Sequence, residues 1–158
     1  MKTTYQFLPI ILFVCSGFFL SVVPASGEQS ALDICGQISA DELAVIHRKP
    51  LYPEAYENEC LWSETPGGMA FLHITVGKIE HPLRDYYVKD LPASVRLEKI
   101  TGIGDEGLVN ISEGTLGVIV IRKGDRLIKS NVVFLDIKPN SKKQEAFYTL
   151  LRRIVDQV

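Results

Sequence analysis

Two runs of β-branched and other apolar residues dominate the C-terminal half of the chain. They span residues 116–121 and 127–135, and the polar segment 123–126 (KGDR) lies between them. Apolar strands joined by a short Gly-containing turn are typical of a β-hairpin. The pattern therefore predicts two antiparallel strands, and the sheet is expected to end before Pro139.

The last part of the chain has the period of an amphipathic helix. Ser141 can cap this helix, and Gln144 follows three residues later. Arg152 and Arg153 lie on the polar side near the C-terminus, where positive charge complements the helix dipole. The apolar stripe at helical spacing consists of Phe147, Leu150, Leu151, Ile154, Val155 and Val158. We expect this helix to lie across the sheet.

A capping box predicts a first helix near the start of the folded region. Ser39 and Glu42 have the S-x-x-E spacing. Pro50 is expected to stop the helix, with Arg48 and Lys49 in its last turn.

The residues after this helix predict a loop and then two strands. Residues 51–58 are rich in Glu and contain Pro53, so they are interpreted as a loop. One strand begins at Cys60, and a second covers 69–76, where every even-numbered position is apolar. This near-alternation predicts one buried and one partly covered face.

The middle of the chain predicts another helix and a short strand. Pro82 suits the first turn of a helix. The apolar residues that follow it at helical spacing are Leu83, Tyr86, Tyr87 and Leu91. A short strand is predicted through Val95 and Leu97.

Separate groups of helices and strands favour an α+β domain, with an antiparallel sheet packed by helices on one side.

The first 27 residues have the organisation of a secretory signal. Lys2 precedes an apolar run over 7–23, Pro24 ends that run, and the small residues 25–27 (ASG) follow. A basic head, an apolar core and a small-residue cleavage site define such signals. We expect cleavage near residue 27, which leaves a single domain over 28–158 in the periplasm or outside the cell.

Two alternatives to a cleavable signal stay open. A membrane anchor needs about 20 apolar residues, and the run over 7–23 is slightly shorter. A lipoprotein signal has a small residue before its Cys, whereas Val14 precedes Cys15.

The segment 28–158 carries 16 basic and 19 acidic residues, which is not the charge of a nucleic-acid-binding domain.

Cys35 and Cys60 are the two cysteines that follow the predicted signal. In an oxidising compartment an even number of cysteines indicates a disulfide. Such a bridge closes a loop of about 26 residues and stabilises by about 3 kcal/mol in chain-entropy models. Two free buried thiols and half of a metal site are the alternatives, but the sequence has no C-x-x-C.

No spacing in the sequence matches a catalytic, metal-binding or cofactor-binding pattern. His47, His73 and His81 form no pair at ligand spacing, and no G-x-S-x-G is present. The glutamates between residues 54 and 59 lack the calcium-loop pattern and are interpreted as solvated. We therefore predict no catalytic residue, metal site or cofactor, although residues could still converge in space.

Three other features have a structural and a functional interpretation. The segment 101–107 (TGIGDEG) is interpreted as a turn. The alternative is a phosphate-binding loop, which would need Gly-Lys-Ser/Thr at its end and a following helix. Residues 110–112 (NIS) form a glycosylation sequon, which matters only in a eukaryotic secretory route. The aromatic residues Tyr52, Tyr56 and Trp62 either form a binding surface or cover the disulfide and the sheet edge.

Several of these features together resemble a group of small exported bacterial proteins, many of them lipid-anchored and best known in actinobacteria. The shared features are Cys35 before the first helix, Cys60 at the first strand, the Gly-rich turn at 102–106, the Gly124-Asp125 hairpin and a closing helix. This chain lacks a lipobox. Such proteins resemble the fold of the extrinsic PsbP subunit of photosystem II, and the resemblance implies a non-enzymatic binding or accessory role.

The sequence therefore favours an exported domain that binds a partner in the cell envelope without catalysis, such as an accessory subunit or inhibitor of an envelope enzyme. The partner would be a protein or a small ligand, with no nucleic acid and no stable membrane span after cleavage. A small hydrolase with a spatially assembled site and a carrier of an apolar ligand are the alternatives. A cleft holding His73 or His81 beside a carboxylate would favour the hydrolase, and a deep cavity under the last helix would favour the carrier.

Overall fold

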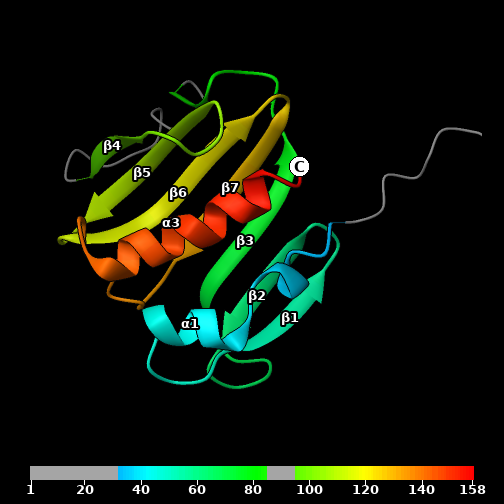
Figure 1. The fold of residues 1–158 in the computed structure, drawn as a ribbon, viewed down its shortest axis with the longest axis vertical. Helices are drawn as coiled ribbons and strands as arrows, with labels where there is room; N and C mark the ends of the chain where they lie inside the picture. The colour runs from blue at the N-terminus through cyan, green and yellow to red at the C-terminus, as the bar shows by residue number, and fades with distance from the viewer. Residues whose placement is uncertain (1–31, 85–94) are drawn as a thin grey trace, which may run out of the picture. The chain divides into compact units, whose positions relative to one another are not determined.

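The computed structural model describes residues 32–84 and 95–158, and within them seven strands form one antiparallel sheet (Figure 1). The strands are β1 (Tyr52–Tyr56), β2 (Glu59–Ser63), β3 (Ala70–Lys78), β4 (Arg96–Ile100), β5 (Glu106–Ser112), β6 (Thr115–Lys123) and β7 (Arg126–Val132). Their order in the sheet is β1-β2-β3-β7-β6-β5-β4. The predicted α+β class with an antiparallel sheet is confirmed in this coarse form.

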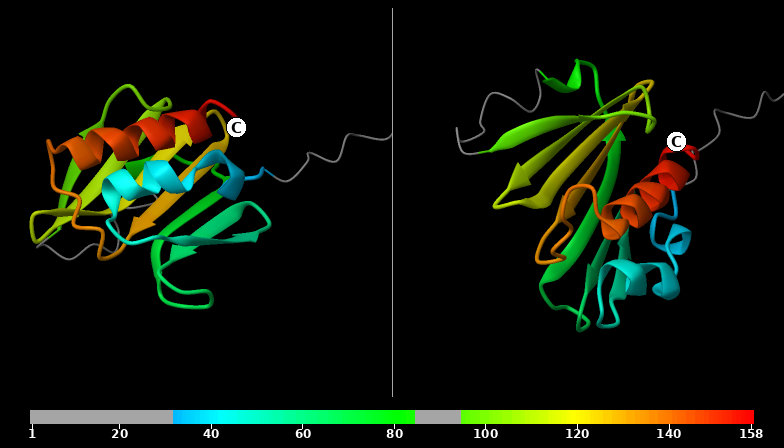
Figure 2. Two further views of the ribbon diagram at one scale, coloured as in Figure 1. Left: turned by 60° about the horizontal axis from the view of Figure 1, so that its bottom comes forward. Right: turned by 60° about the vertical axis from the view of Figure 1, so that its left-hand side comes forward.

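Three of the described helices lie on the same face of the sheet (Figures 1 and 2). They are the short 3-10 helix η1 (Cys35–Gln37), α1 (Ala40–Ile46) and α3 (Lys142–Val155). Ile46 of α1, Leu151 of α3 and Ile74 of β3 are fully buried in one apolar cluster. An ion pair of 2.8 Å between Arg153 and Glu42 also joins the two α-helices.

A second, smaller apolar cluster includes residues that follow β3. Ile79 and Leu83 are buried there with Leu108, Val120 and Leu127 of the sheet. The backbone N–H of Leu83 also donates to the carboxylate of Glu106, at 3.3 Å. The segment after β3 is therefore packed against β5, β6 and β7.

Local signals at the helix starts operate as the sequence predicts. The Ser39 side chain accepts from Glu42 N while the Glu42 carboxylate accepts from Ser39 N, which completes the capping box. Ser141 Oγ accepts a hydrogen bond of 3.2 Å from Gln144 N at the start of α3. The apolar stripe predicted for α3 is buried from Phe147 to Val155.

The first helix is shorter than the sequence pattern predicts. It ends at Ile46, and His47 has extended backbone with φ −136° and ψ 132°. Arg48 and Lys49 therefore lie beyond the last turn rather than in it. Pro50 disfavours helical backbone at the residue before it, so the helix cannot continue up to the proline.

The interpretation of residues 51–58 as a loop is wrong, because Tyr52–Tyr56 forms the edge strand β1. Residues 57 and 58 form a two-residue turn to β2, so Tyr56 and Glu59 are the closing pair. Pairs in an antiparallel hairpin alternate between hydrogen-bonded and non-hydrogen-bonded. Pro53 lies opposite Trp62 at a non-hydrogen-bonded position, where a missing N–H does not break the ladder.

Strand boundaries differ from the predicted ones at three places. β3 continues through Gly77 to Lys78, where the sequence suggested a stop at Gly77. β5 begins at Glu106, inside the Gly-rich segment. β7 ends at Val132 rather than at residue 135, because Phe134 and Asp136 adopt left-handed backbone, with φ of 59° and 45°, which cannot continue a strand.

The predicted cysteine pairing is confirmed. Cys35 is bonded to Cys60, with their Cα atoms 5.4 Å apart. Cys60 is fully buried in β2, and Cys35 packs against the same apolar cluster. The bridge therefore ties η1 to the sheet at the start of the described chain.

Two predictions lie outside the described residues. They are the signal over residues 1–27 and the part of the second predicted helix that contains Tyr86, Tyr87 and Leu91. Leu83 and Arg84, at its start, have helical backbone. No helix among the residues described in the structure is long and apolar enough to cross a membrane.

Candidate functional site

Three aromatic rings from distant parts of the chain meet at one end of the sheet. The ring centroids of His47 and Phe71 are 5.1 Å apart. Those of Phe71 and Phe134 are 6.0 Å apart, in an edge-to-face arrangement. We call these three residues the aromatic patch.

A β-bulge positions Phe71 in this patch. Trp62 pairs with Leu72 and Ser63 pairs with Ala70, so Phe71 is the extra residue between two pairs. A bulge of this kind re-aims a side chain and bends the strand. The carbonyl of Phe71 accepts a hydrogen bond of 2.8 Å from Val133 N, which brings the end of β7 beside it.

The aromatic patch is exposed on its Phe134 side. Phe134 is 69% exposed, and its neighbour Val133 is 38% exposed. Met69, two residues before Phe71, is 67% exposed. Grouped apolar side chains on a protein surface are typical of interaction sites.

Phe134 also has an unfavourable backbone conformation. Its φ of 59° lies in the left-handed region, which is a genuine outlier for a bulky side chain. The other described non-glycine residues with positive φ are Glu113, between β5 and β6, and Asn58, Asp136 and Asn140, whose short polar side chains tolerate this region. The chain therefore holds an exposed aromatic residue where folding alone would favour Gly or Asn.

A charged cluster supports the His47 side of the patch. The Nε2 atom of His47 lies 2.9 Å from Glu64 Oε1, and Lys49 Nζ donates to Glu64 Oε2 at 2.7 Å. Lys49 first, and then His47, lowers the pKa of the Glu64 carboxyl. Glu64 therefore stays ionised and holds the imidazole against Phe71.

The other two histidines lie elsewhere. His73, on β3, has its Nε2 atom 3.1 Å from Glu59 Oε2 on β2, and both side chains are about one-third exposed. His81 is exposed between β3 and Pro82. Among the described residues, neither His47 nor His73 forms a hydrogen bond with a Ser, Thr or Cys side chain. In the described part of the chain, His47 and His73 are each paired with a carboxylate, which is the partner that orients a histidine in many sites.

The Gly-rich segment forms a turn, in agreement with its structural interpretation. Gly102 and Gly104 have φ of 75° and 64°, and a Cβ at Gly104 would collide with the backbone of Arg122. The carboxylate of Asp105 accepts a hydrogen bond of 2.7 Å from Gly124 N. This bond, and then the charges of Lys123 and Arg122, lower the pKa of Asp105. The acidic residue that would repel phosphate instead anchors the β6–β7 hairpin.

The sequon asparagine has a structural contact as well. The Asn110 side-chain oxygen accepts a hydrogen bond of 2.6 Å from Val118 N on the neighbouring strand. A register shift between Val109 and Ile111 makes room for this contact. Asn110 is therefore engaged within the sheet.

The aromatic residues near the disulfide separate into two groups. Trp62 is completely buried in the core, whereas Tyr52 and Tyr56 are 48% and 57% exposed on β1. Trp62 is thus buried in the same cluster as Cys60, whereas Tyr52 and Tyr56 lie on the strand at the edge of the sheet. Glu54 Oε1 accepts from Gly67 N, so this glutamate is engaged in holding a loop.

No group of three or more His, Cys, Asp or Glu in the described part of the chain could hold a metal ion.

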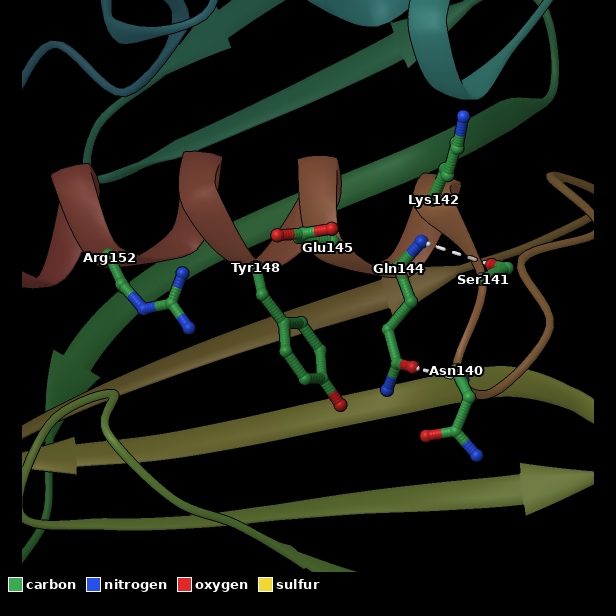
Figure 3. A pocket seen from close by; sticks show the side chains of 7 residues that line it. All are labelled: Asn140, Ser141, Lys142, Gln144, Glu145, Tyr148 and Arg152. Atoms are coloured by element: carbon green, nitrogen blue, oxygen red, sulfur yellow. Dashed lines mark hydrogen bonds between the residues drawn. The ribbon is translucent and has the colours of Figure 1, made fainter.

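A polar groove runs along α3. Its volume is about 470 Å³, and its lining includes Asn140, Gln144, Tyr148 and Arg152. Figure 3 shows Gln144, Tyr148 and Arg152 extending from the same side of the helix. These three follow one another at a spacing of four residues, whereas the sequence pattern placed Gln144 at the helix cap and Arg152 on the polar side.

The aromatic patch could not have been found by sequence reasoning, because residues 47, 71 and 134 share no local pattern. Phe134 itself lies in the apolar run 127–135, which predicts a strand and not an exposed side chain. Comparison with known proteins adds no assignment: no protein-family model matches the chain, and no curated protein or solved structure shows significant similarity to it.

Proposed function

We propose that this chain is an exported, non-enzymatic domain that binds an envelope partner through the aromatic patch. The observation that carries the proposal is Phe134, which is 69% exposed and has left-handed backbone. Strained residues persist where the surrounding structure holds them, and they cluster at functional sites. Folding gains little from this side chain, so binding is the better reason for it.

The patch has the composition of a binding anchor. Phe71 and Phe134 contact each other edge-to-face, which orders both rings before a partner arrives. Ordered aromatic anchors lose little conformational entropy on binding. Side chains of this kind, with apolar neighbours such as Met69, dominate the energy of many interfaces.

Export is supported by two features of the chain. The N-terminal residues follow the pattern of a secretory signal, and the Cys35–Cys60 bridge suits an oxidising compartment such as the periplasm or the exterior. The proposal also takes α3 to be packed across the sheet, which the shared buried cluster supports. The resemblance to small exported lipoprotein-like proteins with a PsbP-like fold is compatible with an accessory or inhibitory role.

The hydrolase alternative has one favourable observation, the two histidine–carboxylate pairs. His47 is held by Glu64, which is itself held by Lys49. His73 and Glu59 lie on adjacent strands of the sheet, and neither histidine lines the α3 groove. Replacing His73 by Gln removes general-base capacity, and we expect the biological activity of the folded protein to survive this change.

The carrier alternative requires an apolar cavity between the sheet and the last helix. Side chains occupy this space, because Phe147, Leu151 and Ile154 of α3 are buried in one cluster with residues of β3, β6 and β7. The groove along α3 is polar at its lining. An interaction domain therefore accounts for the arrangement better than a carrier does.

Site-specific photo-crosslinking tests the proposal directly. A photoreactive phenylalanine analogue placed at residue 134 should form one adduct of defined mass in intact source cells. The matched control places the same analogue at Tyr56, a similarly exposed aromatic residue at the hairpin end of β1. An adduct from residue 56 alone, or identical adducts from both, would reject the aromatic patch as the contact surface.

A further inference from the structure

The groove along α3 has the chemistry of a site for a small polar molecule. Its lining comes from α3 and the residues just before it, 140–141. Its volume of about 470 Å³ falls within the range of small-molecule sites in proteins. The aromatic patch contributes no residue to this groove, so the groove is independent of the proposed partner surface.

Tyr148 is the central side chain of the groove. Its ring packs partly against the apolar core, and Figure 3 shows its hydroxyl at the outer end of the side chain. Burial raises the pKa of this hydroxyl. The phenol is therefore neutral, and it can both donate and accept hydrogen bonds.

The residues on either side of Tyr148 are held in place. Arg152 Nε donates to the carbonyl of Gly102, at 3.3 Å, so the guanidinium is tied to the turn after β4. The Gln144 side-chain oxygen accepts from Asn140 N, and a side-chain hydrogen bond between Gln144 and the Tyr148 hydroxyl partly offsets the rise in the Tyr148 pKa that burial causes. Side chains fixed by such contacts are pre-organised for a ligand.

The charges of the groove argue against an anion as its ligand. Arg152 and Lys142 are accompanied by Glu145 in the lining, and Figure 3 shows Lys142 extending away from Tyr148. The charge of Glu98 on β4 also acts on Tyr148. The backbone N–H of Gln144 at the start of α3 is already capped by Ser141. A mixture of donors and acceptors with nearly balanced charge suits a neutral ligand that also carries both.

We propose that this groove binds a neutral polyhydroxylated ligand, specifically a short glycan segment, with one sugar ring against Tyr148 and hydroxyls bonded to Gln144 and Arg152. An aromatic ring offers the C–H face of a sugar an apolar surface. Amide and guanidinium groups meet its hydroxyls. Apolar ligands are disfavoured because they would leave these polar groups unpaired.

The experiment is an amide-resolved NMR titration of the disulfide-bonded protein recovered after export from cells that express the full chain. The probes are cellotriose, maltotriose and triacetylchitotriose, each raised to about 10 mM, since weak sites of this kind have millimolar dissociation constants. Inorganic phosphate is titrated in parallel as the anionic alternative. We expect at least one trisaccharide to shift amides within residues 140–152 and around Gly102.

Two variants test the residues that the proposal names. Tyr148→Phe keeps the ring and its packing but removes the hydroxyl, and Arg152→Met removes the guanidinium. Each should weaken trisaccharide binding about three- to tenfold, the effect of one lost hydrogen bond. Tyr56→Phe is the matched control on an exposed tyrosine outside the groove and should leave the affinity unchanged.

Three results would overturn the proposal. The first is the absence of shifts in the groove with all three trisaccharides. The second is a groove response to phosphate but to none of the sugars, which identifies an anion site. The third is sugar binding that Tyr148→Phe and Arg152→Met leave unaffected, which places the ligand elsewhere.

Discussion

Asn110 occupies the space that a side chain at residue 117 would need. A Cβ built on Gly117 would collide with the Asn110 side-chain oxygen, and that oxygen accepts the Val118 N–H at 2.6 Å. We expect Gly117→Ala to lower the free energy of unfolding by about 1–3 kcal/mol, because overpacking forces the neighbours apart. Urea denaturation measures the change.

The matched control is Gly77→Ala, also within a strand. No atom lies within 4 Å of a Cβ at residue 77, so this variant should remain within about 1 kcal/mol of the parent or become more stable. Equal losses in both variants would show that Asn110 has no special relationship with Gly117.

The disulfide is expected to supply a large part of the stability. Cys35→Ala should lower the free energy of unfolding by about 2–4 kcal/mol, because the unfolded chain regains the freedom of the open loop. The comparison is made by urea denaturation of oxidised parent and variant. Mass spectrometry without reduction should find the Cys35 and Cys60 peptides linked in the parent, and free thiols in freshly exported protein would contradict the account.

Leu151 tests the docking of α3. Its side chain is fully buried in the main apolar cluster, and Leu151→Ala should cost about 2–5 kcal/mol because it leaves a cavity. Thr149 is exposed on the same helix, and Thr149→Ala should change the stability by less than about 0.5 kcal/mol. An unchanged melting temperature in Leu151→Ala would mean that the helix is not packed on the sheet.

Acid should destabilise the fold through three carboxylates. Hydrogen bonds from the backbone at Ser39 and Gly124 lower the pKa of Glu42 and Asp105, and Lys49 lowers that of Glu64. A folded-state pKa below the unfolded value means that the stabilisation is present above the unfolded value, about 4. It is lost as the pH falls through the folded-state pKa.

The check is the free energy of unfolding measured from neutral pH down to about pH 3. Asp105→Asn keeps an oxygen that can accept from Gly124 N but removes the charge. This variant should therefore show a shallower loss of stability in acid than the parent does. Identical pH profiles would show that the charge of Asp105 does not contribute to the loss of stability in acid.

Local signals explain how much of the fold could be predicted from the sequence. The capping box at Ser39 and the apolar stripe of α3 act within a few residues, so both helices were predicted. β1 was missed because an edge strand with Pro53 and exposed tyrosines has no alternating pattern. The early end of β7 depends on left-handed backbone at Phe134, which no propensity for Phe predicts.

The candidate sites were less predictable, because they depend on contacts between distant residues. His47, Phe71 and Phe134 meet only after the sheet is assembled, and the bulge at Phe71 arises from pairing with β2. The stripe of Gln144, Tyr148 and Arg152 is visible in the sequence. Its significance depends on the Arg152 contact with Gly102, fifty residues away, which the sequence alone does not reveal.

We expect Phe134 to be retained for binding and not for folding. Replacement by Asn removes the edge-to-face contact with Phe71, worth about 0.5–1.5 kcal/mol. It also replaces Phe, which pays about 1–2 kcal/mol for left-handed backbone, by a residue whose short polar side chain tolerates that conformation. The two effects nearly cancel, so the stability of Phe134→Asn should stay within about 1 kcal/mol of the parent.

The most direct test measures stability and partner affinity together in Phe134→Asn, with Tyr56→Asn as the matched control. The partner is the protein recovered by crosslinking at residue 134. For Phe134→Asn we expect unchanged or higher stability and a loss of affinity of at least about thirtyfold, equivalent to a binding anchor worth about 2 kcal/mol. The affinity of Tyr56→Asn should be normal. A Phe134→Asn protein that is clearly less stable but binds its partner normally would contradict this expectation.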